Sequence, residues 1–125
     1  MVNLLLDTSV LIDVLRQYPP AQTWLSQQDA PGVASVVWIE LLQGVRDREA
    51  QRRALKALED FERVDLTVQD VDWAIKQLLR FKLSHNVGGI DCLIASVSYR
   101  LQVPLYTTNL KHFAPLLGTL AQKPY

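Results

Sequence analysis

Three acidic residues and one amide occupy positions where polar side chains could do chemistry. Asp7 and Asn109 each follow a short apolar run that is typical of a buried strand. Asp91 precedes a long apolar segment, and Glu40 lies inside another. Two carboxylates about 4 Å apart repel each other by about 4 kcal/mol at an effective dielectric constant near 20. If these residues converge, we therefore expect them to hold a cation or protons.

Each of these residues also has an ordinary structural interpretation. An aspartate before a helix, such as Asp7 or Asp91, is more often an N-cap than a catalytic group. An asparagine after a strand, such as Asn109, is common in turns. Glu40 is harder to explain unless it faces solvent, because it lies within the apolar run Val36–Leu42 and no basic residue on the adjacent helical turns neutralises it. Glu40 is thus the residue that first indicates a metal.

The types of ligand predict the metal and the reaction. Carboxylates, an amide carbonyl and water favour Mg²⁺ or Mn²⁺, whereas zinc usually takes histidine or cysteine. His85 and His112 lack the spacing of zinc ligands. A divalent ion held by carboxylates can activate water and stabilise a leaving oxygen. Phosphodiester hydrolysis is the natural reaction, since the sequence contains no nucleophile elbow, phosphate-binding loop or dinucleotide fingerprint.

The elements that must position these residues alternate between strands and amphipathic helices. Strands are expected at Val2–Leu6, Val33–Ser35, Arg63–Leu66 and Val103–Tyr106, with an edge strand in the tail. Helices are expected at Ser9–Arg16, from Pro19-Pro20 onward, and at Val36–Val45, Glu49–Phe61, Val68–Leu83, Cys92–Leu101 and Leu110–Leu117. Pro31-Gly32 predicts a turn, and Asp91 is expected to cap the helix that follows it.

This alternation predicts an α/β fold, a three-layer α/β/α sandwich with a small parallel sheet and right-handed crossovers. Ligands of such sheets bind at the carboxyl ends of the strands, where Asp7 and Asn109 are expected. The length of 125 residues indicates one domain spanning residues 1–125. A hydrophobic content of 49% with 21% charged residues is enough for a full core.

Charge and hydropathy exclude several classes of protein. A formal net charge of zero excludes coating of nucleic acid by bulk electrostatics, so any such contact must be local. Met1–Leu6 has no basic flank, and no segment approaches the roughly 20 apolar residues of a membrane span. We therefore expect a cytoplasmic protein without a membrane partner. The single cysteine, Cys92, rules out an internal disulfide and is interpreted as a packed core thiol.

Local clusters of basic residues are candidates for phosphate contacts. Those beside Asp91 and Asn109 are preferred, and they are Arg80, Lys82 and Lys111. A second cluster flanks the Glu40 helix and is interpreted as a solvated face because acidic residues interleave it; its members are Arg46, Arg48, Arg52, Arg53 and Lys56.

Four segments of the sequence resemble, in order, the successive motifs of the PIN domain. They read LLDTSVLID at residues 5–13, ASVVWIELLQGV at 34–45, IDCLIA at 90–95 and PLYTTNLKHF at 104–113. The resemblance covers essentially the whole chain and is closest to the VapC-type toxins of toxin-antitoxin pairs. It implies a Mg²⁺- or Mn²⁺-dependent endoribonuclease, a homodimer, and a cognate antitoxin that blocks the site.

The resemblance also implies roles for individual residues. Its invariant acids match Asp7, Glu40 and Asp91, and Asn109 matches a position held by Asp or Asn. Hydroxyl positions that support the acids match Thr8 and Thr107. The sequence departs from the pattern at Trp38, where a threonine is frequent, and at Thr108, where an arginine is frequent and would contact phosphate.

Two rival functions and one structural alternative are left open by the sequence. Asn109 gives the metal one charge fewer, which suits a PIN-like scaffold that binds RNA or a partner without cutting. A phosphoacceptor receiver domain also has an aspartate after its first strand, but it needs two adjacent acids there, and Thr8 follows Asp7. Aromatic side chains that fall off the apolar stripes either support a homodimer or pack in the core, and they are Trp24, Trp73 and Phe81.

Overall fold

A five-stranded sheet runs through the middle of the computed structural model, which describes residues 1–125. The strands lie in the order β3-β2-β1-β4-β5, and every neighbouring pair is parallel. Their bounds are β1 Leu4–Leu6, β2 Pro31–Ala34, β3 Glu62–Val64, β4 Leu105–Tyr106 and β5 Ala121–Gln122. The predicted parallel sheet, including the edge strand in the tail, is thus confirmed.

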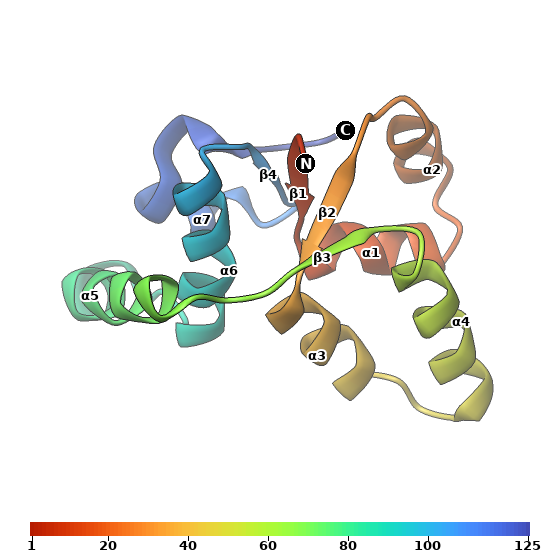
Figure 1. Cartoon of the computed structure of the whole chain (residues 1–125), viewed down its shortest axis with the longest axis horizontal. Coiled ribbons are helices and arrows are strands. Elements are labelled where there is room, and N and C mark those ends of the chain that lie inside the picture. The colour runs from red at the N-terminus through yellow and green to blue at the C-terminus, as the bar shows by residue number, and fades with distance from the viewer.

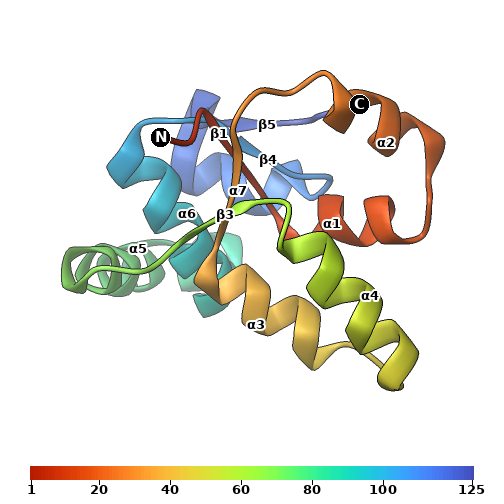
Figure 2. The ribbon, with the colours of Figure 1, turned by 45° about the vertical axis from the view of Figure 1, so that its right-hand side comes forward.

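Helices cover both sides of this sheet. Figures 1 and 2 show α5 and α6 on one side of the strands and α1, α2 and α4 on the other. The helices are α1 Thr8–Leu15, α2 Pro19–Ser26, α3 Ser35–Gln43, α4 Arg48–Leu58, α5 Val68–His85, α6 Gly89–Leu101 and α7 Leu110–Leu117, followed by the 3₁₀ turn Gly118–Leu120. This arrangement confirms the three-layer α/β/α fold. None of these helices has both the length and the apolar character needed to cross a membrane.

The central strand β1 divides the order of the sheet. From β1 the chain moves outward through β2 and β3, and it later returns to the other side of β1 for β4 and β5. The carboxyl ends of β1 and β4 are therefore neighbours at a topological switch point, where open parallel sheets bind ligands. Asp7 directly follows β1 and Thr107 directly follows β4. Pairing of the two strands brings these residues to one edge of the sheet.

The core lies between the sheet and its helices. Strand β1 is buried along its whole length, and α6 buries Cys92 and every residue of Ile94–Ser98. Burial, together with the neighbouring charge of Asp91, raises the pKa of the Cys92 thiol. A neutral, buried thiol agrees with the expected packed core cysteine.

Two local predictions are wrong. Pro31 and Gly32 do not form a turn but lie in β2, where Gly32 pairs with Leu5 of β1. The reason is a close approach, since a Cβ atom on Gly32 would lie 2.5 Å from Cγ1 of Val2. Nor does Asp91 cap α6, because that helix begins at Gly89. Asp91 instead lies in the first turn of α6, and its side chain makes no capping hydrogen bond.

The three aromatic side chains that fall off the apolar stripes pack against the core. Trp24, Trp73 and Phe81 are half-buried. The Trp24 ring lies 4.8 Å from that of Tyr106, and the Trp73 ring stacks on Tyr99 at 4.9 Å between centroids.

The exposed apolar surface lies elsewhere, along α5. Only part of the predicted apolar face of this helix packs on the protein, through residues such as Ala74. The remaining stripe faces solvent at Val71, Ile75, Leu79 and Leu83.

Candidate active site

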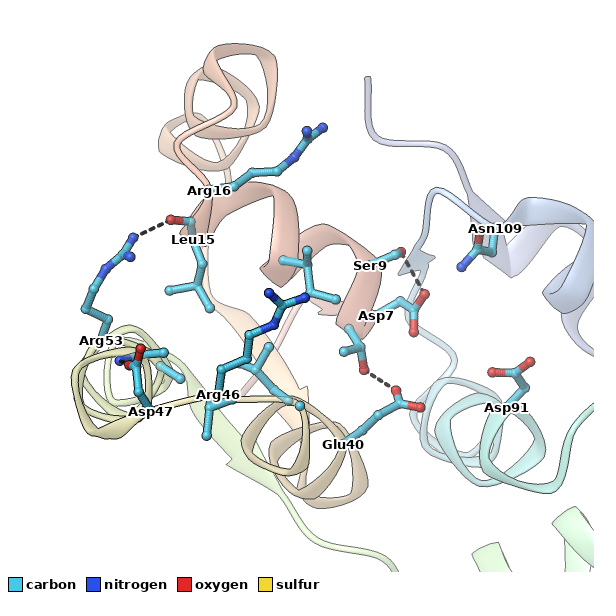
Figure 3. Close-up of a pocket in the computed structure, with 17 residues that line it drawn as sticks. Asp7, Ser9, Leu15, Arg16, Glu40, Arg46, Asp47, Arg53, Asp91 and Asn109 are labelled. Atoms are coloured by element: carbon cyan, nitrogen blue, oxygen red, sulfur yellow. Dashed lines mark hydrogen bonds between the residues drawn. The ribbon is translucent and has the colours of Figure 1, made fainter.

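One pocket of about 990 Å³ collects all four residues that the sequence singled out. It opens at the carboxyl edge of the sheet, and Figure 3 shows three carboxylates facing a common space with Asn109 beside them. Asp7 follows β1 and Asn109 follows β4, whereas Glu40 comes from α3 and Asp91 from α6. Four separate segments therefore contribute one polar side chain each.

The Asp7 carboxylate is held by two hydroxyl groups. Its side chain is buried, and its Oδ2 accepts hydrogen bonds from Ser9 Oγ and Thr107 Oγ1, both at 2.8 Å. These hydroxyls in turn accept backbone N–H groups, that of Thr108 at 3.1 Å and that of Asn109 at 2.9 Å. Asp7 stands at the N-cap position of α1, yet its side chain makes no capping bond. The ordinary cap interpretation therefore fails, and Oδ1 is left without a protein partner.

The partner of Glu40 is a neutral hydroxyl group, and not the cation that a carboxylate in an apolar helix was expected to need. Its Oε1 accepts a hydrogen bond from the hydroxyl of Thr8, a buried residue at the start of α1. Val36, Val37 and Leu41 of α3 are buried in the core, whereas Glu40 lines the pocket. No lysine, arginine or histidine forms an ion pair with it. The negative charge of Glu40 thus remains available to a cation.

The pKa of Asp91 depends on its burial and on the charges of the other two acids. Burial raises the pKa of its carboxyl group, and the charges of Asp7 and Glu40 raise it further. His112 acts in the opposite direction, with Nδ1 lying 3.6 Å from Asp91 Oδ2. The charges of Asp7 and Glu40 therefore disfavour the ionised form of Asp91, which is the condition that a bound cation relieves.

The donor set fits an open Mg²⁺ or Mn²⁺ site and not a closed cage. No three His, Cys, Asp or Glu side chains lie close enough together to enclose a metal ion by themselves. Mg²⁺ ordinarily keeps several water ligands and binds proteins through one or two carboxylates, so a preformed cage is not required. The oxygens without protein hydrogen bonds, such as Oδ1 of Asp7 and Oε2 of Glu40, are hard ligands of the right kind.

Three hydroxyl groups donate hydrogen bonds to the carboxylates, and one of them was not predicted from the sequence. Thr8 contacts Glu40 and Thr107 contacts Asp7, which are the two hydroxyl positions singled out from the sequence. Ser9 was interpreted only as part of a helix start, yet it also holds Asp7. The spacing of two residues between Asp7 and Ser9, at the entrance to a helix, was the available signal.

The basic residues of the pocket differ from the predicted ones. Arg80, Lys82 and Lys111 do not line it. The guanidinium of Arg80 lies over the Phe81 ring, and Lys82 donates to Asn86 Oδ1 at 2.9 Å. The cations that do line it are Arg16, Arg46 and Arg53. Arg46 and Arg53, which the sequence assigned to a solvated face, are exposed and also line this pocket.

Comparison with known proteins finds one family and close relatives. The model of the PIN domain family matches residues 4–114. Ribonuclease VapC19 of Mycobacterium tuberculosis is 34% identical to the chain, and the match covers 97% of this chain and 98% of that protein.

Solved structures with the same fold include two toxin-antitoxin complexes. DNA-bound VapBC from Salmonella typhimurium superposes with a TM-score of 0.80 at 20% identity, covering 100% of both chains. VapBC2 from Rickettsia felis, bound to a promoter DNA fragment, gives 0.77 at 22% identity, covering 98% of both chains.

Proposed function

Because this chain belongs to the PIN-domain family, we propose that it is a metal-dependent endoribonuclease and the toxin of a toxin-antitoxin pair. We take residues 1–125 as one PIN domain. The observation that carries the proposal is the convergence of Asp7, Glu40 and Asp91 on one pocket, where no lysine or arginine pairs with any of the three and only His112 lies near Asp91. Its substrate class follows from the relative named a ribonuclease.

The residues proposed to hold Mg²⁺ or Mn²⁺ are the three carboxylates, with the side-chain carbonyl of Asn109 as a neutral fourth ligand. When bound, such an ion activates water for attack on phosphorus and stabilises charge on the leaving oxygen. Hydrolysis in this way leaves a 5′-phosphate and a 3′-hydroxyl on the RNA. Mg²⁺ and Mn²⁺ share the preference for oxygen ligands, and the donor set suits both.

The protein's own contribution is to hold the carboxylates ready. Ser9 and Thr107 fix the rotation of the Asp7 carboxylate by occupying Oδ2, so Oδ1 stays directed at the pocket. Thr8 does the same for Glu40. Groups that are prearranged in this way need no reorganisation during the reaction, which is why supporting hydrogen bonds commonly contribute 10-fold to 100-fold to metal affinity or activity.

We further propose two protein partners. The first is a cognate antitoxin, supported by structural neighbours that are toxin-antitoxin complexes. The second is another copy of this chain, docked on the apolar stripe of α5. Leu79 and Leu83 are 80% and 98% exposed there, and large apolar side chains in a row are costly to leave in water.

Cleavage of RNA by purified protein tests the proposed activity. With Mn²⁺ and total RNA, the parent protein should produce fragments, and EDTA should abolish the cleavage. Asp7→Asn keeps the size of the side chain but removes one negative charge, so it should also be inactive. Cleavage by this variant at the parent rate would mean that the metal-site assignment is wrong.

A further inference from the structure

The pocket has two ends of opposite charge. One end holds the carboxylates, and the other holds three arginines from different parts of the chain, as Figure 3 shows. We call Arg16, Arg46 and Arg53 the arginine end. The acidic residue at this end is Asp47, whose Oδ1 is occupied as the cap of α4 by the backbone N–H of Ala50 at 2.8 Å.

The guanidinium groups at the arginine end retain free donors. Arg46 forms no hydrogen bond and no ion pair with the protein. Arg53 donates one hydrogen bond from its guanidinium group to the carbonyl of Leu15, at 2.6 Å. Arg16 donates only its Nε, to Asp13 Oδ1 at 2.9 Å, and Asp13 is itself held by the hydroxyl of Tyr125. Arg46 and Arg53 therefore carry positive charge that no ion pair with the protein neutralises, whereas Arg16 is paired with Asp13 and keeps only its terminal nitrogens free.

RNA needs positive charge near this pocket in order to bind beside the carboxylates. RNA phosphates are repelled by Asp7, Glu40 and Asp91, and the net charge of the chain is zero, so no general field attracts RNA. The three arginines are the cations that line the pocket. Guanidinium groups bind phosphate oxygens through paired N–H donors, which gives them an orientation that an ammonium group lacks.

The pocket is also lined by apolar side chains. Ile12, Leu15 and Val45 line it, and Ile12 is 50% exposed. A flat nucleobase can lie on such a surface while the phosphates on either side reach the guanidinium groups. An acidic peptide would use the arginines but would leave most of this apolar wall in water.

We propose that the arginine end is a positioning subsite that binds the RNA backbone and one base beside the bond to be cut. This inference rests on the proposed function and deepens it, since it assigns how a neutral protein holds a polyanion next to three carboxylates. Arg46 is the principal contact, because its guanidinium has no other partner. Arg53 and Arg16 are oriented by the contacts described above and complete the subsite.

Fluorescence anisotropy with a short, labelled, single-stranded RNA tests the subsite without cleavage. The protein carries Asp7→Asn, and the buffer contains EDTA, so the RNA stays intact. Adding Arg46→Ala should weaken binding about tenfold, the effect of losing a charge-assisted contact. The slope of log K against log salt should shrink by about 0.7 for each lost phosphate contact. Arg46 forms no hydrogen bond or ion pair with the protein, so its loss should leave the melting temperature unchanged.

The matched control is Arg48→Ala. Arg48 lies two residues away, is also exposed and carries the same charge, but it does not line the pocket. Its removal should leave both the affinity and the salt slope at the values of the Asp7→Asn parent. Equal losses for the two variants would overturn the subsite and indicate a general charge effect. A charge reversal, Arg46→Glu, should weaken binding more than Arg46→Ala and so confirms the sign of the effect.

Two further outcomes separate this inference from its alternatives. If the parent protein fails to cut RNA but RNA binding still depends on Arg46, the subsite stands and the nuclease proposal fails. If the parent cuts RNA and binding ignores Arg46, only the subsite is overturned. A labelled oligoglutamate of matched charge is measured in parallel. Dependence on Arg46 for that peptide, but not for RNA, would assign the arginine end to an acidic protein segment.

Discussion

Thr107 donates its hydroxyl to Asp7 Oδ2 at 2.8 Å, across 100 residues of sequence. The bond joins the residue after β4 to the residue after β1, on the two strands that flank the switch point of the sheet. Thr107 is fully buried and Asp7 nearly so. A buried carboxylate in this position must be satisfied by donors, and hydroxyls satisfy it without cancelling its charge.

The first prediction concerns this contact. Thr107→Val keeps the shape of the side chain, removes the donor to Asp7 and leaves the N–H of Asn109 without its acceptor. We expect cleavage to fall about tenfold or more, and the free energy of unfolding to fall by about 1 to 2 kcal/mol. Kinetics at saturating Mn²⁺ and urea unfolding measure the two effects. The control is Thr108→Val, whose side chain makes no hydrogen bond; a similar loss there would contradict the argument.

The second prediction follows from the raised pKa of Asp91. A raised pKa means that folding favours the protonated form, so ionised Asp91 lowers the stability of the metal-free protein at neutral pH. Asp91→Asn should therefore raise the melting temperature in EDTA at pH 7. The advantage should vanish as the pH falls below about 4, where aspartate is protonated even when unfolded.

Saturating Mn²⁺ should reverse the order of the melting temperatures, since the metal stabilises only the protein that binds it. The control for Asp91→Asn is Asp72→Asn, an exposed residue of α5 that lies outside the pocket. If Asp91→Asn melts below the parent in EDTA at pH 7, burial and the charges of Asp7 and Glu40 do not disfavour ionised Asp91 as described.

The third prediction addresses the proposed dimer. Leu79→Glu places a charge in the middle of the exposed stripe of α5 and should convert the dimer to a monomer, because burying an unpaired carboxylate is costly. Sedimentation velocity measures the mass of both proteins. Leu55→Glu makes the same change at an exposed leucine of α4 and should leave the dimer intact. Dissociation by Leu55→Glu alone would move the interface to α4.

The fourth prediction tests the ion pair that joins α5 to α6. Asp70 is 2% exposed and accepts both the Arg100 Nε, at 2.9 Å, and the backbone N–H of Thr67 in a capping box. Asp70→Ala should lower the free energy of unfolding by about 3 kcal/mol, because it strands Arg100 and removes part of the cap. Metal affinity measured by calorimetry should not change, since Asp70 is outside the pocket. Asp72→Ala, on the exposed side of α5, should have little effect on either.

The order and type of the elements follow from the sequence because they depend on local pattern. Leu110–Leu117 is helical as predicted, and each expected strand is present within a few residues of its predicted bounds. Local pattern gave a wrong prediction at Gly32, since Pro31-Gly32 usually indicates a turn but here lies in β2, where the glycine allows a close approach of Val2. It could not divide the apolar face of α5 into a packed half and an exposed half, since hydrophobicity alone does not say what lies opposite.

The sequence by itself determined the acidic residues and their order, because four motifs at fixed spacing carry that information within each segment. Only the tertiary structure decided what surrounds them. Ser9 and Thr107 meet at Asp7 because β1 and β4 pair, and Arg46 and Arg53 enter the pocket because α3 and α4 pack beside α1. A contact between distant segments depends on how strands and helices assemble, and the spacing of residues along the chain does not contain it.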